Sequence, residues 1–165
     1  MELTHVTHEC IPLYINEDSN ILILGSLPSV KSREEGFFYA HKRNRFFLTL
    51  SHLFNENEPL SIPERKGFLK RHKIALYDVI YECDIHGSSD SSIKNAVPID
   101  IETILKEHPN IKCIAINGGK AKQLFDKYLL NKISRGTKVI YLPSTSPANA
   151  KTSQNELDEA YKALL

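Results

Sequence analysis

The sequence predicts an α/β domain of three layers, in which helices cover both faces of a central four-stranded, mainly parallel sheet. Short apolar runs recur along the chain without polar alternation, as in strands that are buried on both faces. Segments with apolar residues at helical spacing separate these runs. The hydrophobic fraction of 41% and the charged fraction of 25% are ordinary for a globular protein. Such alternation of strand and helix is typical of a parallel sheet.

Runs rich in isoleucine, leucine and valine are the expected strands, at Ile21–Ser26, Ile74–Tyr81, Ile111–Asn117 and Val139–Leu142. Helices are expected at Arg45–Phe54, Pro63–Arg71, Ile99–Lys106, Lys120–Leu130 and Gln154–Leu165. The Arg45–Phe54 segment carries a stripe of phenylalanine and leucine at helical spacing, and Pro63 suits a helical first turn. The polar stretch Cys83–Pro98 is expected to be irregular, and therefore mobile or functional.

No repeat or linker interrupts this pattern. Residues 1–165 are therefore expected to form a single domain, with residues 1–20 as an N-terminal extension packed on it. No apolar run approaches the roughly 18 residues of a membrane span. The start, Met1–His5, lacks the pattern of a secretory signal, so a cytoplasmic location is expected. Nothing demands an oligomer, and a monomer is expected.

The sequence also argues against several kinds of chemistry. The three cysteines are scattered, and no segment has metal-ligand spacing, so neither a disulfide framework nor a metal site is expected. The motifs of Walker P-loops, Rossmann folds, zinc proteases and serine hydrolases are absent. No paired carboxylate can be assigned, and Asp78 and Asp84 are candidates only by their proximity to a strand. A site built from amides favours a reaction whose leaving group departs readily.

The loop after the first strand is the most informative segment. Ligands of open α/β sheets bind at the carboxyl ends of strands, and here Gly25 permits a sharp turn that Pro28 stiffens. Tyr39 then offers an aromatic face on which a flat heterocycle could stack, while Phe37 and Phe38 fit ordinary core positions.

Three amide or hydroxyl sites follow, and each has two interpretations. The carboxamide of Asn44 could orient a water molecule, or it could cap the helix that begins near Arg45. Asn117, at the end of the third strand, could read a base edge or simply form a turn. The loop Pro143–Asn149 could hold a phosphodiester ahead of Lys151, or it could be a capped turn. The net charge of +1 does not itself indicate a nucleic-acid partner.

An ordered set of segments resembles a known family: Leu24–Ser29, Ser32–Tyr39, His41–Phe46, Tyr77–Val79, Gly87–Ile93, Asn117–Gly118 and Pro143–Ala150. Together they resemble the uracil-DNA glycosylase superfamily, closest to its hypoxanthine-DNA glycosylase branch, also called DNA-deoxyinosine glycosylases. The resemblance implies a parallel four-stranded sheet and a monofunctional enzyme of base excision repair. Such an enzyme would flip a deaminated nucleotide out of double-stranded DNA and hydrolyse its N-glycosidic bond. No metal or cofactor is implied.

The resemblance also implies roles for individual residues. The catalytic residues would be Asn44, which holds the attacking water, and Ser144, which stands where other branches have histidine or asparagine. Leu27 replaces the water-positioning aspartate or asparagine of uracil-specific and mismatch-specific relatives, so hypoxanthine is expected to be preferred over uracil. Lys42 stands where many relatives have proline, which implies a looser turn. The residues that would bind the base are Gly25, Ser26, Tyr39 and Asn117, and those that would bind DNA are Arg43, Ser146, Pro147, Asn149 and Lys151.

Three alternatives stay open at this point. A glycosylase of the same fold could remove uracil from G·U mispairs. A module without catalytic activity could use the same pocket to bind damaged DNA. An α/β hydrolase could act on free nucleotides. Assays on inosine-containing and uracil-containing duplexes, and on free deoxyinosine, separate these functions.

Overall fold

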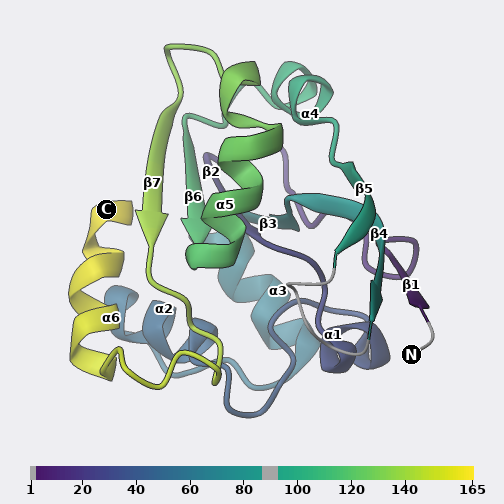
Figure 1. Ribbon diagram of the computed structural model, residues 1–165. Coiled ribbons are helices and arrows are strands. Elements are labelled where there is room, and N and C mark those ends of the chain that lie inside the picture. Colours follow the sequence, from purple (N-terminus) through teal and green to yellow (C-terminus); the bar gives the residue numbers. More distant parts are fainter. Residues whose placement is uncertain (1–2, 87–92) are drawn as a thin grey trace.

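The computed structural model (Figure 1) describes residues 3–86 and 93–165, so the Gly87–Ser92 part of the predicted polar loop lies outside the described residues. Its centre is a parallel sheet with the strand order β3-β2-β6-β7. The strands are β2 (Ile21–Gly25), β3 (Ile74–Asp78), β6 (Cys113–Asn117) and β7 (Lys138–Leu142). Leu22, Ile23 and Leu24 are fully buried, which explains why this strand lacks polar alternation. The predicted fold class is confirmed.

Helices cover both faces of this sheet. They are α1 (Val30–Glu35), α2 (Phe46–Phe54), α3 (Ile62–Arg71), α4 (Ile101–Glu107), α5 (Gly119–Tyr128) and α6 (Gln154–Tyr161), with 3₁₀ turns η2 (Leu130–Lys132) and η3 (Lys162–Leu164). In Figure 1, α5 crosses in front of β6, and the paler α2 and α3 lie farther from the viewer. Helix α5 packs on β6, α3 on β3, and α6 on both β7 and α2. No helix within the described ranges is long and apolar enough to cross a membrane.

Side-chain caps set where several helices begin. Helix α4 starts two residues later than predicted, because the carboxylate of Asp100 accepts the Thr103 N–H and so caps it. Ser153 and Glu156 form a reciprocal capping box at the start of α6. The last residues of the expected C-terminal helix tighten into η3 instead of continuing α6.

Two predictions are wrong in the region after β3. The expected strand Ile74–Tyr81 is divided, because the chain leaves β3 at Asp78 and enters β4 (Ile80–His86). The expected irregular stretch contains the rest of β4 and β5 (Lys94–Pro98), and these pair with β1 (Leu3–Thr7) in an antiparallel sheet of order β1-β4-β5. Burial along β4 largely alternates and β5 is mostly exposed, so neither strand has the continuous apolar run of the central sheet.

Candidate functional site

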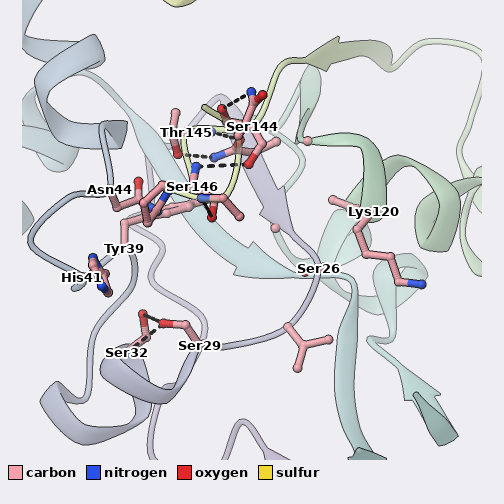
Figure 2. Close-up of a pocket in the computed structure, with 18 of the residues that line it drawn as sticks. Ser26, Ser29, Ser32, Tyr39, His41, Asn44, Lys120, Ser144, Thr145 and Ser146 are labelled. Atoms are coloured by element: carbon pink, nitrogen blue, oxygen red, sulfur yellow. Dashed lines mark hydrogen bonds between the residues drawn. The ribbon is translucent and has the colours of Figure 1, made fainter. Parts of the chain in front are cut away.

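A cavity of about 990 Å³ lies at the carboxyl ends of β2, β3, β6 and β7. Most predicted site residues line it, namely Gly25, Ser26, Tyr39, Asn44, Asn117, Ser144, Ser146, Pro147, Asn149 and Lys151. Figure 2 shows Tyr39, Asn44, Thr145 and Ser146 gathered together. Arg43 is the exception: it is exposed, it is absent from the lining, and its backbone N–H donates to Nδ1 of His41 at 3.1 Å. Two loops far apart in sequence therefore face one cavity.

Asn117 fastens the second loop to the central sheet. Its Nδ2 donates to Oγ1 of Thr145 at 3.0 Å, and its Oδ1 accepts the Thr145 N–H at 3.1 Å. Thr145 is fully buried, and its carbonyl accepts the Arg45 N–H at 3.0 Å, which ties the same loop to the start of α2. Both polar atoms of Asn117 are thus engaged by protein, so its direct effect is on the shape of the loop. A contact to a base stays a prediction.

The second loop also braces itself from within. Oγ of Ser144 accepts the Ser146 N–H, and Oγ of Ser146 accepts the Ala148 N–H. Asn149 donates through Nδ2 to the Ser144 carbonyl at 2.9 Å and to Thr152 at 3.0 Å. Hydroxyl side chains therefore hold this backbone in place of the regular backbone hydrogen bonds of a helix or a sheet. The capped-turn interpretation describes the loop itself, while its position at the cavity keeps the DNA-binding interpretation open.

Asn44 supports the start of α2, as one of its two interpretations predicted, and its water-holding role stays a prediction. Its Oδ1 accepts the Phe46 N–H at 3.0 Å and so caps the start of α2, and its own N–H donates to the His41 carbonyl. The residue nevertheless lines the cavity and is half-buried. Its Nδ2 forms no hydrogen bond within residues 3–86 and 93–165. Because an amide oxygen has two lone pairs, the fixed carboxamide can still accept from a water molecule while its Nδ2 donates.

Tyr39 contributes an aromatic wall whose backbone is strained. Its φ of +54° lies in the left-handed region, which aromatic residues rarely adopt. One ring face stacks on Phe46, with centroids 3.9 Å apart and planes inclined by 17°. Burial raises the pKa of its hydroxyl well above the ordinary value, and the charge of Asp78 adds to that rise. The nearby side chain of Asn117 partly offsets this rise in pKa. The Tyr39 hydroxyl nevertheless has no hydrogen-bond partner in the described parts of the chain.

Helix α1 supports the turn that carries Tyr39. Ser29 caps the helix by accepting the Ser32 N–H at 3.1 Å, and its hydroxyl donates to Oγ of Ser32. Ser32 is buried, and its Oγ accepts the Ala40 N–H at 3.4 Å. Phe37 and Phe38 are buried, as their core interpretation predicted. The turn that carries Tyr39 is therefore held by the Ser32 hydroxyl and by the packing of Phe37 and Phe38 in the core.

A buried histidine and carboxylate beside the cavity were missed as site residues. Asp78 lines the cavity at the end of β3, opposite Gly25 in the parallel register. His8, from the segment after β1, places its Nε2 3.0 Å from Oδ2 of Asp78. The signal for Asp78 was its place at the end of an apolar strand, but no local pattern links it to His8, because the two meet only through tertiary packing.

The rim of the cavity carries cationic side chains. Lys31 also lines it, but pairs with Glu35 at 3.1 Å. Lys120 and Lys151 line it without an ion pair in the described part of the chain, and Figure 2 shows Lys120 pointing away from the labelled group. Within residues 3–86 and 93–165, no group of three or more histidine, cysteine, aspartate or glutamate side chains is placed to hold a metal ion.

Comparisons with known proteins agree with this geometry. Residues 12–165 match the family model described as the Uracil DNA glycosylase superfamily. A Methanosarcina acetivorans protein named Hypoxanthine DNA glycosylase is 34% identical over 149 residues, which are 90% of this chain and 92% of that protein. A Methanosarcina barkeri protein of the same name is 33% identical over 156 residues, 92% of this chain and 96% of that protein.

A solved structure is similar over nearly the whole chain. It is a solution NMR structure of a candidate uracil DNA glycosylase from Methanosarcina acetivorans, with a TM-score of 0.77 and 30% sequence identity. The similarity covers 93% of this chain and 96% of that one. The central sheet and the two loops at its carboxyl edge therefore lie within a region that has a known structural counterpart.

Proposed function

The chain belongs to the uracil DNA glycosylase superfamily, and on that premise we propose that it hydrolyses the N-glycosidic bond of deaminated nucleotides in DNA, hypoxanthine before others. The observation that carries this proposal is the cavity at the carboxyl edge of the sheet, which holds a fixed carboxamide beside a stacked aromatic wall. The names of the two Methanosarcina relatives support hypoxanthine as the preferred base.

The proposed reaction begins when the nucleotide rotates out of the duplex into the cavity. Extrusion costs a few kcal/mol and costs least for a mispaired base, so weak pairing helps to select damage. The free face of the Tyr39 ring would stack on the base, while Gly25 and Ser26 form the wall beside it. Asn117 would act there by holding Thr145 in place, since its amide already binds that residue.

Cleavage would then follow a dissociative course, in which the sugar gains positive charge as the purine departs. Asn44 would hold the attacking water through its remaining lone pair, because its contact with the Phe46 N–H fixes the side chain. Ser144 lines the same cavity and would contact the reacting nucleotide. Backbone amides of the Tyr39 turn would stabilise charge on the leaving base, and one donor of this type contributes about 3 kcal/mol.

The loop and its basic neighbours would bind the DNA backbone. Ser146, Pro147 and Asn149 lie in a braced turn at the cavity, Lys151 lines the same cavity, and the exposed Arg43 would add a second positive charge. Because phosphate contacts release counterions, DNA affinity should fall steeply with salt. Lys151→Ala should flatten the salt dependence, whereas the distant Lys162→Ala should not.

The decisive experiment uses duplexes that carry a single inosine or a single uracil. Release of hypoxanthine, seen as an alkali-labile site, supports the proposal, and faster release of uracil from a G·U mispair would reverse the base preference. Binding of inosine DNA without formation of alkali-labile sites would point to a damage-binding module. Release from free deoxyinosine but not from DNA would point to a nucleotide hydrolase.

A further inference from the structure

His8 is a buried side chain that lies outside every motif of the family resemblance. Its backbone N–H donates to the Tyr81 carbonyl at 3.0 Å, and its ring lies against Tyr77 with centroids 4.7 Å apart. Its Nδ1 lies 2.8 Å from the Ile11 carbonyl oxygen. A carbonyl oxygen can only accept, so Nδ1 carries a hydrogen and the ring has a fixed orientation.

This orientation directs Nε2 at Asp78. Nε2 lies 3.0 Å from Oδ2, in an electrostatic contact that is not aligned as a hydrogen bond, and it has no other polar partner in the described chain. The His8 side chain is fully buried and that of Asp78 is 8% exposed. In such surroundings a carboxylate needs a partner, and the His8 ring lies on the Oδ2 side of Asp78.

The second carboxylate oxygen is thereby left as a bare acceptor. Oδ1 forms no hydrogen bond within residues 3–86 and 93–165, and it occupies the space above the Gly25 Cα, where a Cβ would lie 2.5 Å from it. The Tyr39 hydroxyl lies 3.6 Å from that same Cβ position. All three residues line the cavity. The bare acceptor of Asp78 therefore lies in the cavity, where a base would enter.

Deamination changes a base in a way that such an acceptor can detect. Replacing the amino group of adenine by a carbonyl converts N1 from an acceptor into an N–H donor, and the same change occurs at N3 when cytosine becomes uracil. A carboxylate oxygen accepts from the new N–H but repels the lone pair of the undamaged ring nitrogen. The wrong base would also leave a buried charge without a hydrogen bond, which is costly.

We propose that His8 is a positioning residue that holds Asp78 with one bare oxygen toward the extruded base, so that Asp78 selects bases whose ring nitrogen carries a hydrogen. The inference rests on the proposed function and deepens it by naming a specificity-determining pair. Asp78 supplies the contact, and His8 acts through it from the segment after β1. Neither residue takes part in bond cleavage.

The test compares inosine with deoxynebularine, whose purine lacks the N1 hydrogen, in otherwise identical duplexes under single-turnover conditions. The wild-type enzyme should release hypoxanthine at least about ten-fold faster than purine, which corresponds to one hydrogen bond to a charged group. Asp78→Asn should lower this rate ratio about ten-fold, because the amide can donate to N1. His8→Ala should lower the ratio likewise, and His8→Gln should restore most of it, since the glutamine amide can donate to Oδ2.

A matched pair on the protein surface provides the control. His5, in β1, contacts Asp84 at 2.9 Å, and its side chain is 57% exposed. His5→Ala and Asp84→Asn should leave the ratio at the wild-type value. Thermal melting shows whether each variant folds, and if Asp78→Asn does not fold, the two His8 variants decide.

The outcomes separate the inference from the proposed function. An unchanged ratio in folded Asp78→Asn or His8→Ala, even with both rates reduced equally, would assign the pair a structural task and overturn the inference alone. Equal wild-type rates on the two duplexes would overturn it as well. A wild-type enzyme that releases no base from either duplex would overturn the proposed function itself.

Discussion

The ring of Tyr39 lies nearly parallel to that of Phe46, with centroids 3.9 Å apart. Phe46 is fully buried, and it also contacts Phe47 and Tyr161 edge to face. The stack is thus anchored in the core between α2 and α6, while Tyr39 reaches the cavity. A platform backed in this way loses little freedom when a base stacks on it, because the ring is already held in place.

Replacement of Tyr39 by leucine should weaken binding of inosine DNA by about 1–3 kcal/mol, the usual contribution of one base stacked on an aromatic ring. Tyr39→Phe keeps the stack and removes only a buried hydroxyl that has no hydrogen-bond partner among the described residues, so it should bind DNA normally and melt at the same temperature or higher. Titration of fluorescent duplexes measures both. Equal binding by the leucine variant would remove Tyr39 from the base site.

The cap and the proposed chemical task of Asn44 can be separated by two substitutions. Asn44→Ala should cost about 1 kcal/mol in stability, because the Phe46 N–H loses its acceptor, and it should abolish base release. Asn44→Asp retains the capping oxygen and should unfold as the wild type does. Denaturant titration gives the free energy of unfolding, and single-turnover cleavage gives the rate. Normal cleavage by the alanine variant would leave Asn44 with the cap alone.

Gly25 leaves no room for a side chain. A Cβ there would lie 2.5 Å from Oδ1 of Asp78, so Gly25→Ala should cost about 1–3 kcal/mol in stability through overpacking and should distort the cavity. Gly119, the first residue of α5, has no atom of the described residues within 4 Å of its Cβ position, apart from its chain neighbours and the backbone of its own helix. Gly119→Ala is therefore the matched control and should melt at the wild-type temperature or above it. Similar melting of both variants would contradict this explanation.

Asn117 should protect the backbone of the second loop. In Asn117→Ala the buried Thr145 N–H loses its acceptor, and a lost buried partner costs about 1–3 kcal/mol. Hydrogen exchange at the Thr145 amide, followed by NMR, should become faster. Asn110→Ala, which removes a surface bond to the Glu17 carbonyl, should leave that exchange rate unchanged. Unaltered exchange at Thr145 in the Asn117 variant would show that the loop holds its shape by other contacts.

The His5–Asp84 pair should make the stability of the antiparallel sheet depend on pH. The hydrogen bond to Asp84 raises the pKa of His5 above 6.5, and the bonds from Asn95 and His5 lower the pKa of Asp84 below 3.8. The stabilising effect of His5 is complete below pH 6.5 and is lost as the pH rises through the raised pKa. That of Asp84 is complete above pH 3.8 and is lost as the pH falls through the lowered one.

An NMR titration of His5 tests this pair directly. Asp84→Asn should bring the pKa of His5 back toward its ordinary value, because the largest cause of the rise is removed. Asp158→Asn alters the contact between Asp158 in α6 and His52 in α2, and it should leave the titration of His5 unchanged. A raised pKa that persists in the Asp84 variant would assign the effect to another group.

The central sheet could be predicted from the sequence because burial on both faces leaves a local mark. Runs such as Ile21–Leu24 are apolar throughout, and the helices between them show apolar spacing and capping residues. The antiparallel sheet could not be predicted in this way. Strand β5 is mostly exposed, so its hydrogen bonds to β4 leave little hydrophobic pattern in the residues themselves.

The same distinction, between what the sequence predicts and what it does not, applies to the candidate site. By itself the sequence determined the two strand-end loops, Tyr39, Asn44 and Ser144, since glycine, proline, amides and hydroxyls mark a turn at the place where they occur. Only the tertiary structure decided that the amide of Asn117 is taken up by Thr145, and that His8 meets Asp78 beside the cavity. Such contacts join residues far apart in the chain, and what selects them is the need of a buried polar group for a partner, which acts only once the chain has folded.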